Sequence, residues 1–173
     1  MRLIIATVAL FAAAPAGAII VSAQSNGFEL KHSVEMSLPP ARALAAFADF
    51  GAWWSKAHSY SGEAGRMTLD LRPGGCLCER LDDGGGVEHM RVVLYQPGER
   101  IVLTGGLGPL LTAATSAVMD VRVTKTGTGS RLDLNYRAAG FARGDGTMMA
   151  AGVDQVLREQ IERLRTFARR GKV

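Results

Sequence analysis

The sequence has few cysteines and no concentration of charge of one sign. Only 2 of its 173 residues are cysteine, which excludes the small secreted scaffolds that depend on several disulfides. Lysine and arginine number 20 against 16 aspartate and glutamate residues, and the basic residues are spread along the chain without a run. A formal charge of +4 distributed in this way does not indicate a nucleic-acid partner.

The motifs of several enzyme classes are also missing. The chain contains no HExxH zinc-protease motif, no Gly-x-Ser-x-Gly nucleophile elbow and no nucleotide-binding fingerprint after a strand. The glycine-rich segment 105–111 lacks the Lys-Ser/Thr pair of a phosphate-binding loop, and Pro109 removes a backbone donor from it. We therefore expect neither a metal site nor a cofactor.

Residues 1–23 have the pattern of a secretory signal peptide. A short basic start precedes a charge-free run that ends on the small residues 21–23, which suit a signal peptidase. We expect cleavage before Gln24, with residues 16–18 as a second candidate site, and a periplasmic or secreted protein without stable membrane insertion. An uncleaved membrane anchor is the alternative, since about 20 apolar residues span a bilayer.

Residues 24–173 show the periodicity of a single globular domain. Apolar and polar residues alternate at 28–38 and repeatedly between 65 and 139, with glycine-rich turns between the runs. Helix formers occupy 41–50, and apolar residues recur every three or four positions between 149 and 168. We predict an α+β fold: a curved antiparallel sheet of about six to seven strands wrapped around a long C-terminal helix, with two short helices after the first strand.

Two local features of these elements lead to specific predictions. Asp154 and Arg158 are four residues apart, so we expect an ion pair on the exposed side of the last helix. Cys76 and Cys78 share a strand face with Cα atoms about 6.6 Å apart, whereas a disulfide needs its Cβ atoms about 3.8 Å apart. We therefore predict two unpaired thiols, because a metal site would need two further ligands such as His58 or His89.

Three segments carry a family resemblance. They are GGCLCERL at 74–81, VEHMRVV at 87–93 and LTGGLGPL at 103–110, within a match of about residues 28–169. They resemble bacterial SRPBCC proteins related to the activator of the heat-shock-protein-90 ATPase, in a superfamily that also holds START lipid-transfer domains, polyketide cyclases and plant pathogenesis-related proteins. The resemblance implies the helix-grip fold with a cavity between sheet and last helix, and it implies no particular reaction.

Three ionisable residues share strand faces with apolar neighbours and are candidates for catalysis. His32, Glu79 and Glu88 would face one cavity, where they could perform general acid and base chemistry. The structural alternative is that each lies at a strand end or pairs with an arginine such as Arg80 or Arg91.

Aromatic residues and an apolar glycine loop predict the mouth of the cavity. Segment 53–60 holds three aromatic residues and a histidine, where the resemblance implies that the cavity opens. Segment 105–111 is predicted to form a gate, with a buried hairpin bend as the alternative, and either tryptophan could belong to the core instead. The residues expected to line a ligand site are Trp53, Trp54, His58, Tyr60, Met90, Leu107, Met119, Leu134 and Tyr136.

These features predict an exported protein that binds a small hydrophobic or amphipathic molecule between its sheet and last helix. One alternative is a cavity-based enzyme of cyclase, aromatase or hydrolase type that uses His32, Glu79 and Glu88. A second is a protein-interaction role resembling the activator of a chaperone ATPase. Export disfavours that role, because the cytosolic chaperone and its ATP would be absent.

Overall fold

The computed structural model describes residues 17–171, so residues 1–16 of the predicted signal peptide lie outside the described residues. The described chain forms one eight-stranded antiparallel sheet, three α-helices and three short 3-10 helices. The strands are β1 (Gly17–Gln24), β2 (Gly27–Met36), β3 (Met67–Leu69), β4 (Cys76–Arg80), β5 (Gly86–Gln96), β6 (Arg100–Gly105), β7 (Ser116–Thr126) and β8 (Gly129–Ala139). The helices are α1 (Pro40–Ala48), α2 (Phe50–Trp53), α3 (Gly146–Arg169), η1 (Lys56–His58), η2 (Ala64–Arg66) and η3 (Gly108–Leu111).

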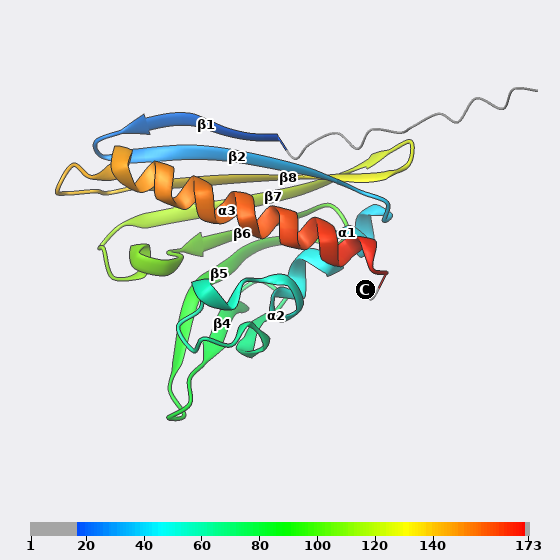
Figure 1. Cartoon of the computed structure of the whole chain (residues 1–173), viewed down its shortest axis with the longest axis horizontal. Coiled ribbons are helices and arrows are strands. Elements are labelled where there is room, and N and C mark those ends of the chain that lie inside the picture. Colours follow the sequence, from blue (N-terminus) through cyan, green and yellow to red (C-terminus); the bar gives the residue numbers. More distant parts are fainter. Residues whose placement is uncertain (1–16, 172–173) are drawn as a thin grey trace, which may run out of the picture.

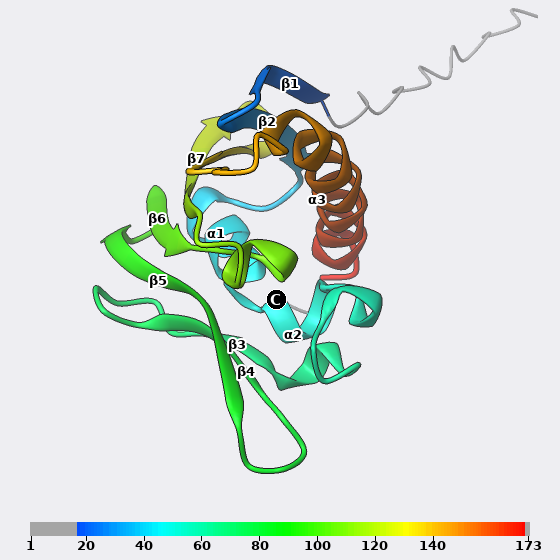
Figure 2. The same ribbon diagram turned by 90° about the vertical axis from the view of Figure 1, so that its left-hand side faces the viewer.

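The sheet curls around α3, as Figures 1 and 2 show. Its strand order is β1-β2-β8-β7-β6-β5-β4-β3, and α3 packs against β1, β2, α1 and α2. Figure 2 shows η3 on the concave side of the sheet, between β6 and α3. The predicted α+β helix-grip architecture is therefore confirmed. None of the helices in residues 17–171 is long and apolar enough to cross a membrane.

The sheet has one strand more than the upper limit predicted from the sequence. Residues 17–24 form the edge strand β1, which pairs antiparallel with β2 from Gly17–Ser33 to Gln24–Gly27. All but the last residue of β1 belong to the predicted signal peptide. Cleavage before Gln24 would therefore remove this strand.

The core lies between the concave face of the sheet and α3. In β8, the side chains of Leu132, Leu134 and Tyr136 are buried while their neighbours point outward, as the period-two alternation predicts. On α3, the buried stripe includes Ala150, Asp154, Leu157, Ile161 and Leu164, spaced three or four residues apart. The predicted ion pair between Asp154 and Arg158 is confirmed, but the prediction that Asp154 lies on the exposed side is wrong, because its position falls within this stripe.

A β-bulge in the β4–β5 pair changes which side chains of β5 face inward. Leu77 pairs with Met90 and Cys78 pairs with Glu88, so His89 is an extra residue on β5. His89 and Met90 are consequently both buried, whereas Glu88 is exposed and pairs with Arg91 on the surface. The prediction that Glu88 faces the interior is wrong, because the bulge shifts the strict alternation of the strand by one residue.

The prediction of two free thiols is also wrong. Cys76 and Cys78 form a disulfide, and their Cα atoms are 5.4 Å apart. This separation is shorter than the roughly 6.6 Å of a regular strand and within the range that a disulfide allows. The short separation shows that β4 is contracted between these residues, opposite the bulge of β5.

We expect the denatured, unreduced protein to leave both cysteines unreactive toward a thiol reagent. Its mass should be about 2 Da below the value for two thiols and should rise by that amount on reduction. Replacing both cysteines (Cys76→Ser with Cys78→Ser) should lower the free energy of unfolding by only about 1.5 kcal/mol, since the closed loop is short. Thiol labelling without a reductant would contradict the pairing.

Candidate functional site

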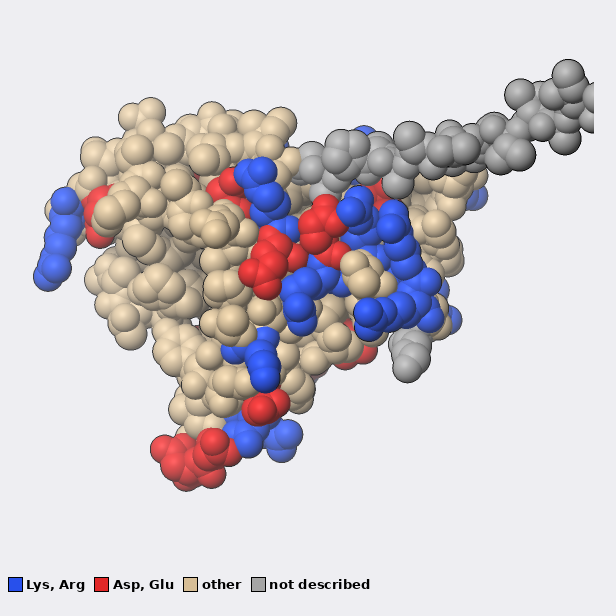
Figure 3. Space-filling view, in the orientation of Figure 1, with Lys and Arg blue, Asp and Glu red and all other residues tan. Residues whose placement is uncertain are grey.

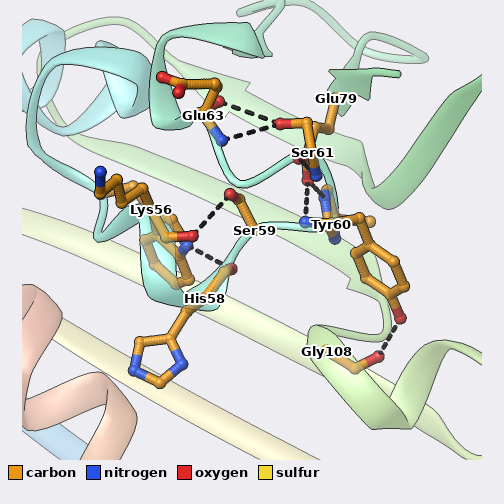
Figure 4. A network of polar contacts seen from close by, with 10 residues as sticks. Lys56, His58, Ser59, Tyr60, Ser61, Glu63, Glu79 and Gly108 are labelled. Atoms are coloured by element: carbon orange, nitrogen blue, oxygen red, sulfur yellow. Dashed lines mark hydrogen bonds and ion pairs between the residues drawn. The ribbon is translucent and has the colours of Figure 1, made fainter. Parts of the chain in front are cut away.

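A buried carboxylate and imidazole form the most distinctive polar pair of the structure. Glu79 extends from β4 and His89 from the bulge of β5, with Glu79 Oε2 at 2.9 Å from His89 Nε2. Both side chains are at most 2% exposed. Glu79 also accepts hydrogen bonds from the backbone N–H groups of Tyr60 at 3.1 Å and Ser61 at 2.5 Å, which Figure 4 shows. The carboxylate therefore ties segment 60–61 to the sheet.

The hydrogen bonds of Glu79 determine where the protons of the pair lie. Burial pushes the pKa of Glu79 upward, but hydrogen bonds from Ser61, Tyr60 and His89 outweigh this effect and hold the pKa below its usual value. An ionised carboxylate only accepts hydrogen bonds, so His89 must donate the hydrogen on Nε2 to it. His89 Nδ1 is buried and has no hydrogen-bond partner among the described residues. This nitrogen is the free polar atom of the pair, and a carboxylate-oriented imidazole of this kind can accept a hydrogen bond or a proton.

Tyr60 and segment 105–111 cover this pair. The Tyr60 ring is half exposed and lies 5.7 Å from the His89 ring, measured between centroids. Its hydroxyl donates a hydrogen bond to the Gly108 carbonyl at 3.0 Å, as Figure 4 shows. Gly106 N–H donates to the His89 carbonyl at 2.9 Å, so the segment contacts both Tyr60 and β5.

The glycines of segment 105–111 allow this close approach. Gly105 has φ +143°, and a Cβ atom there would lie 2.5 Å from the His89 carbonyl oxygen and 2.8 Å from Met90 Cα. The segment ends in η3, which buries Leu110 completely in the core. It therefore has features of both predicted alternatives: it connects two paired strands, and it covers the space beneath it.

Exposed apolar side chains lie around segment 105–111 and the amino-terminal end of α3. Tyr60, Leu111 and Met148 are 50%, 37% and 71% exposed, and Leu107 and Met149 are half buried. In Figure 3 the surface is recessed between the amino-terminal half of α3 and η3, and uncharged atoms surround the recess. Basic side chains gather instead over the carboxyl-terminal half of α3. Apolar exposure of this kind is typical of a binding surface.

Four predicted ligand-lining residues lie on the inner face of the sheet. Met90, Met119, Leu134 and Tyr136 are at most 3% exposed, so side chains fill the space beneath η3. The Tyr136 hydroxyl lies close to the Leu107 backbone but makes no hydrogen bond of good geometry within the described chain. Burial raises the pKa of Tyr136 to about 12, against a smaller opposite effect of the Leu107 backbone. The hydroxyl therefore stays protonated at neutral pH.

A separate hollow lies on the outer face of the sheet. Its volume is about 510 Å³, and charged side chains contribute much of its lining. The charged lining residues are Lys31, Asp120, Arg122, Arg131, Asp133 and Arg137. This lining does not suit an apolar ligand, because such a ligand would have to strip water from the charges.

The two tryptophans are buried in the hydrophobic core. Trp53 and Trp54 are 3% and 4% exposed and pack in an aromatic cluster with Phe47 and Phe50, with ring centroids 4.7–5.9 Å apart. Trp53 Nε1 donates to the Phe47 carbonyl at 3.1 Å, and Trp54 Nε1 donates to the His58 carbonyl at 2.8 Å. Both rings thus belong to the core, and Tyr60 is the aromatic residue of this segment at the opening.

The remaining histidines lie away from the Glu79–His89 pair. His58 is partly exposed, with Nε2 at 3.3 Å from Glu159 of α3. His32 of β2 is buried, with Nε2 at 3.1 Å from Asp154 Oδ1 of α3, although the two groups are poorly aligned for a hydrogen bond. His32 contacts Asp154, Glu79 contacts His89, and Glu88 pairs with Arg91 on the surface, so the three predicted catalytic candidates have separate partners.

We expect His32 to make the stability of the protein depend on pH. Burial lowers the pKa of His32; Asp154 opposes the shift and Arg158 adds to it. The unfolded chain therefore binds more protons at this residue, and the free energy of unfolding should decrease as the pH falls below about 6.5. Urea unfolding at about pH 7.5 and about pH 5.5 should show a larger loss for the unmodified protein than for His32→Gln. Equal losses would contradict this assignment.

Two residues of the site and core were not recognised from the sequence. The sequence indicates His89 only as a possible metal ligand, and no local pattern indicates the bulge that turns its side chain inward. The burial of Asp154 could be predicted from helical spacing, since the residue is four positions after Ala150 and three before Leu157. Within residues 17–171, no three His, Cys, Asp or Glu side chains are grouped so that they could hold a metal ion.

Comparisons with known proteins agree with this architecture. Residues 27–169 match the family model described as polyketide cyclase / dehydrase and lipid transport. Membership of this family implies binding of a lipid or another small hydrophobic molecule. No curated protein matches the sequence.

Solved structures of bacterial proteins share the fold at low sequence identity. A protein from Mesorhizobium loti is 20% identical with a TM-score of 0.58, and the alignment covers 84% of this chain and 99% of that one. A protein from Rhodobacter sphaeroides is 14% identical with a TM-score of 0.60, covering 90% and 100% of the two chains. One from Staphylococcus saprophyticus is 11% identical with a TM-score of 0.56, covering 83% and 93%. At these identities the similarity establishes the fold alone.

Proposed function

Since the chain belongs to the polyketide cyclase / dehydrase and lipid transport family, we propose that it binds a small amphipathic molecule beneath segment 105–111, between the sheet and α3. One observation carries the proposal: exposed apolar side chains, including Tyr60 and Leu111, lie around segment 105–111, and the Tyr60 ring packs next to the buried Glu79–His89 pair. An amphipathic ligand would meet apolar surface along its length and a polar group at one end.

Access to this site requires segment 105–111 to move. The Tyr60–Gly108 hydrogen bond and the buried side chain of Leu110 hold the segment in place. Releasing them costs about 1 kcal/mol for the hydrogen bond and about 2 kcal/mol for exposing the leucine. A difference of this size leaves a minor open population that a ligand can stabilise.

The burial of apolar ligand surface supplies the affinity. Removing about 200 Å² of apolar surface from water contributes roughly 5 kcal/mol before the costs of association. Micromolar affinity requires more than this, so the ligand must either bury a larger surface or add polar contacts.

The neutral dye N-phenylnaphthylamine tests the location of the site. We expect it to bind the native protein stoichiometrically, with a rise in dye fluorescence. Filling the interior with Met119→Trp or Leu134→Trp should abolish binding, because both side chains lie buried on the inner face of the sheet. Val93→Trp is the matched control, since Val93 is 52% exposed, and it should bind the dye normally. Unchanged binding in folded forms of both interior variants would place the site elsewhere.

We also propose that the protein is exported. The Cys76–Cys78 disulfide supports this, because disulfides persist in oxidising compartments. The pairing of β1 with β2 favours the second candidate site, since cleavage after Ala18 would keep residues 19–24 in the sheet. Sequencing the amino terminus of the exported protein separates Ile19 from Gln24 as the first residue. An intact Met1 would contradict cleavage altogether.

A further inference from the structure

We infer that the Glu79–His89 pair binds the polar end of the ligand and selects a head group that donates a hydrogen bond, such as an alcohol or a phenol, over a carboxylate. The inference rests on the proposed function, because it assigns the head group of the same ligand. It uses one unpartnered atom, His89 Nδ1, which lies on a side chain that is 2% exposed.

The first step concerns the tautomer of His89. Glu79 receives three hydrogen bonds, from Tyr60 N, Ser61 N and His89 Nε2. All three nitrogens point to the two carboxylate oxygens, which can only accept hydrogen bonds. His89 Nε2 must therefore carry a hydrogen, because a lone pair there would face the lone pairs of the carboxylate. In a neutral imidazole, Nδ1 then carries no hydrogen and can only accept a hydrogen bond. A buried acceptor without a partner is costly, so a ligand that donates to Nδ1 gains more than it would at an exposed site.

The second step concerns charge. No lysine or arginine of residues 17–171 lies within ion-pair distance of Glu79, and Arg91 pairs instead with Glu88 on the surface. A ligand carboxylate next to His89 Nδ1 would face the lone pair of this nitrogen and the nearby negative charge of Glu79. In a buried environment this repulsion is only weakly screened. A neutral hydroxyl avoids both penalties.

The Tyr136 hydroxyl is a second buried polar group close to segment 105–111. It is completely buried and lacks a hydrogen bond of good geometry within the described chain. It lies close to the Leu107 backbone, one residue after the Gly106 N–H that binds the His89 carbonyl. A hydroxyl can both donate and accept hydrogen bonds, so a neutral hydroxyl-bearing ligand is also compatible with the Tyr136 hydroxyl, whereas a carboxylate cannot donate.

Displacement of N-phenylnaphthylamine by dodecanol, dodecanoate and dodecane tests this selectivity. At about pH 8, where an ordinary imidazole is uncharged, we expect dodecanol to displace the dye on the order of tenfold more strongly than dodecanoate or dodecane. His89→Gln can still donate to Glu79 but lacks an atom at the Nδ1 position, so it should bind the dye and lose the preference. Glu88→Gln is the control, because Glu88 lies outside the site, and it should keep the preference.

The outcomes separate the inference from the proposed function. If the dye binds but dodecanoate competes as well as dodecanol, the head-group assignment is wrong and the binding site stands. If the dye does not bind the unmodified protein at all, the proposed function itself fails. Nitrogen NMR of His89 at the same pH should show hydrogen on Nε2 and none on Nδ1, and an imidazolium or the opposite tautomer would overturn the inference.

Discussion

Replacing Glu79 with glutamine should lower the free energy of unfolding by about 3 kcal/mol, although the two side chains have nearly the same shape. Three N–H groups donate to the carboxylate of Glu79. A glutamine amide offers one accepting oxygen and turns its NH₂ group toward at least one of these donors. Two donors then face each other in a buried site, and the charge that strengthened the remaining hydrogen bonds is lost.

Glu88→Gln is the matched control for this prediction. Glu88 lies on the neighbouring strand, is exposed and pairs with Arg91 at the surface, so its replacement should cost less than about 1 kcal/mol. Urea unfolding of both variants measures the difference. Equal losses would show that the Glu79 pair is not the buried hydrogen-bond centre described above. Segment 60–61 should also lose hydrogen-exchange protection in Glu79→Gln alone, because its two N–H groups donate to different oxygens of Glu79 and glutamine keeps only one of them.

Trp53→Ala should lower the free energy of unfolding by about 3 to 5 kcal/mol. Trp53 is 3% exposed, and its indole ring packs against Phe47, Phe50 and Trp54 while Nε1 donates to the Phe47 carbonyl. Truncation to alanine leaves a cavity within this cluster and an unpaired carbonyl. Urea or thermal unfolding measures the loss.

The paired variant Tyr60→Ala distinguishes a core role from a role at the opening. Tyr60 is half exposed and its side chain makes one hydrogen bond to Gly108, so its truncation should cost about 1 kcal/mol. Dye binding should respond in the opposite order: Tyr60→Ala should change the affinity or the binding rate, and the folded fraction of Trp53→Ala should bind normally. A large binding defect in folded Trp53→Ala would assign that tryptophan to the ligand site.

The main elements of the fold could be predicted from the order of residues because their signals are local. In β8, every second side chain from Leu132 to Tyr136 is buried, and this alternation is visible in the sequence itself. The apolar spacing of α3 similarly indicates which stripe faces the sheet, although the charge of Asp154 led to the opposite prediction for that residue. The sequence predicts Tyr60 and segment 105–111 at the mouth of a cavity, whereas their contact through Gly108 could not be predicted from it.

Tertiary structure decides which residues form the buried polar pair. A period-two pattern places Glu88 inward and His89 outward, and the bulge between β4 and β5 reverses both. The bulge depends on the pairing of two strands, and the short Cα separation of Cys76 and Cys78 belongs to the same irregular stretch. A one-residue shift in register leaves no local mark in the sequence, because each strand alone could continue its alternation. Residue order therefore accounts for the sheet and its long helix, whereas strand pairing decides that His89, and not Glu88, meets Glu79 in the interior.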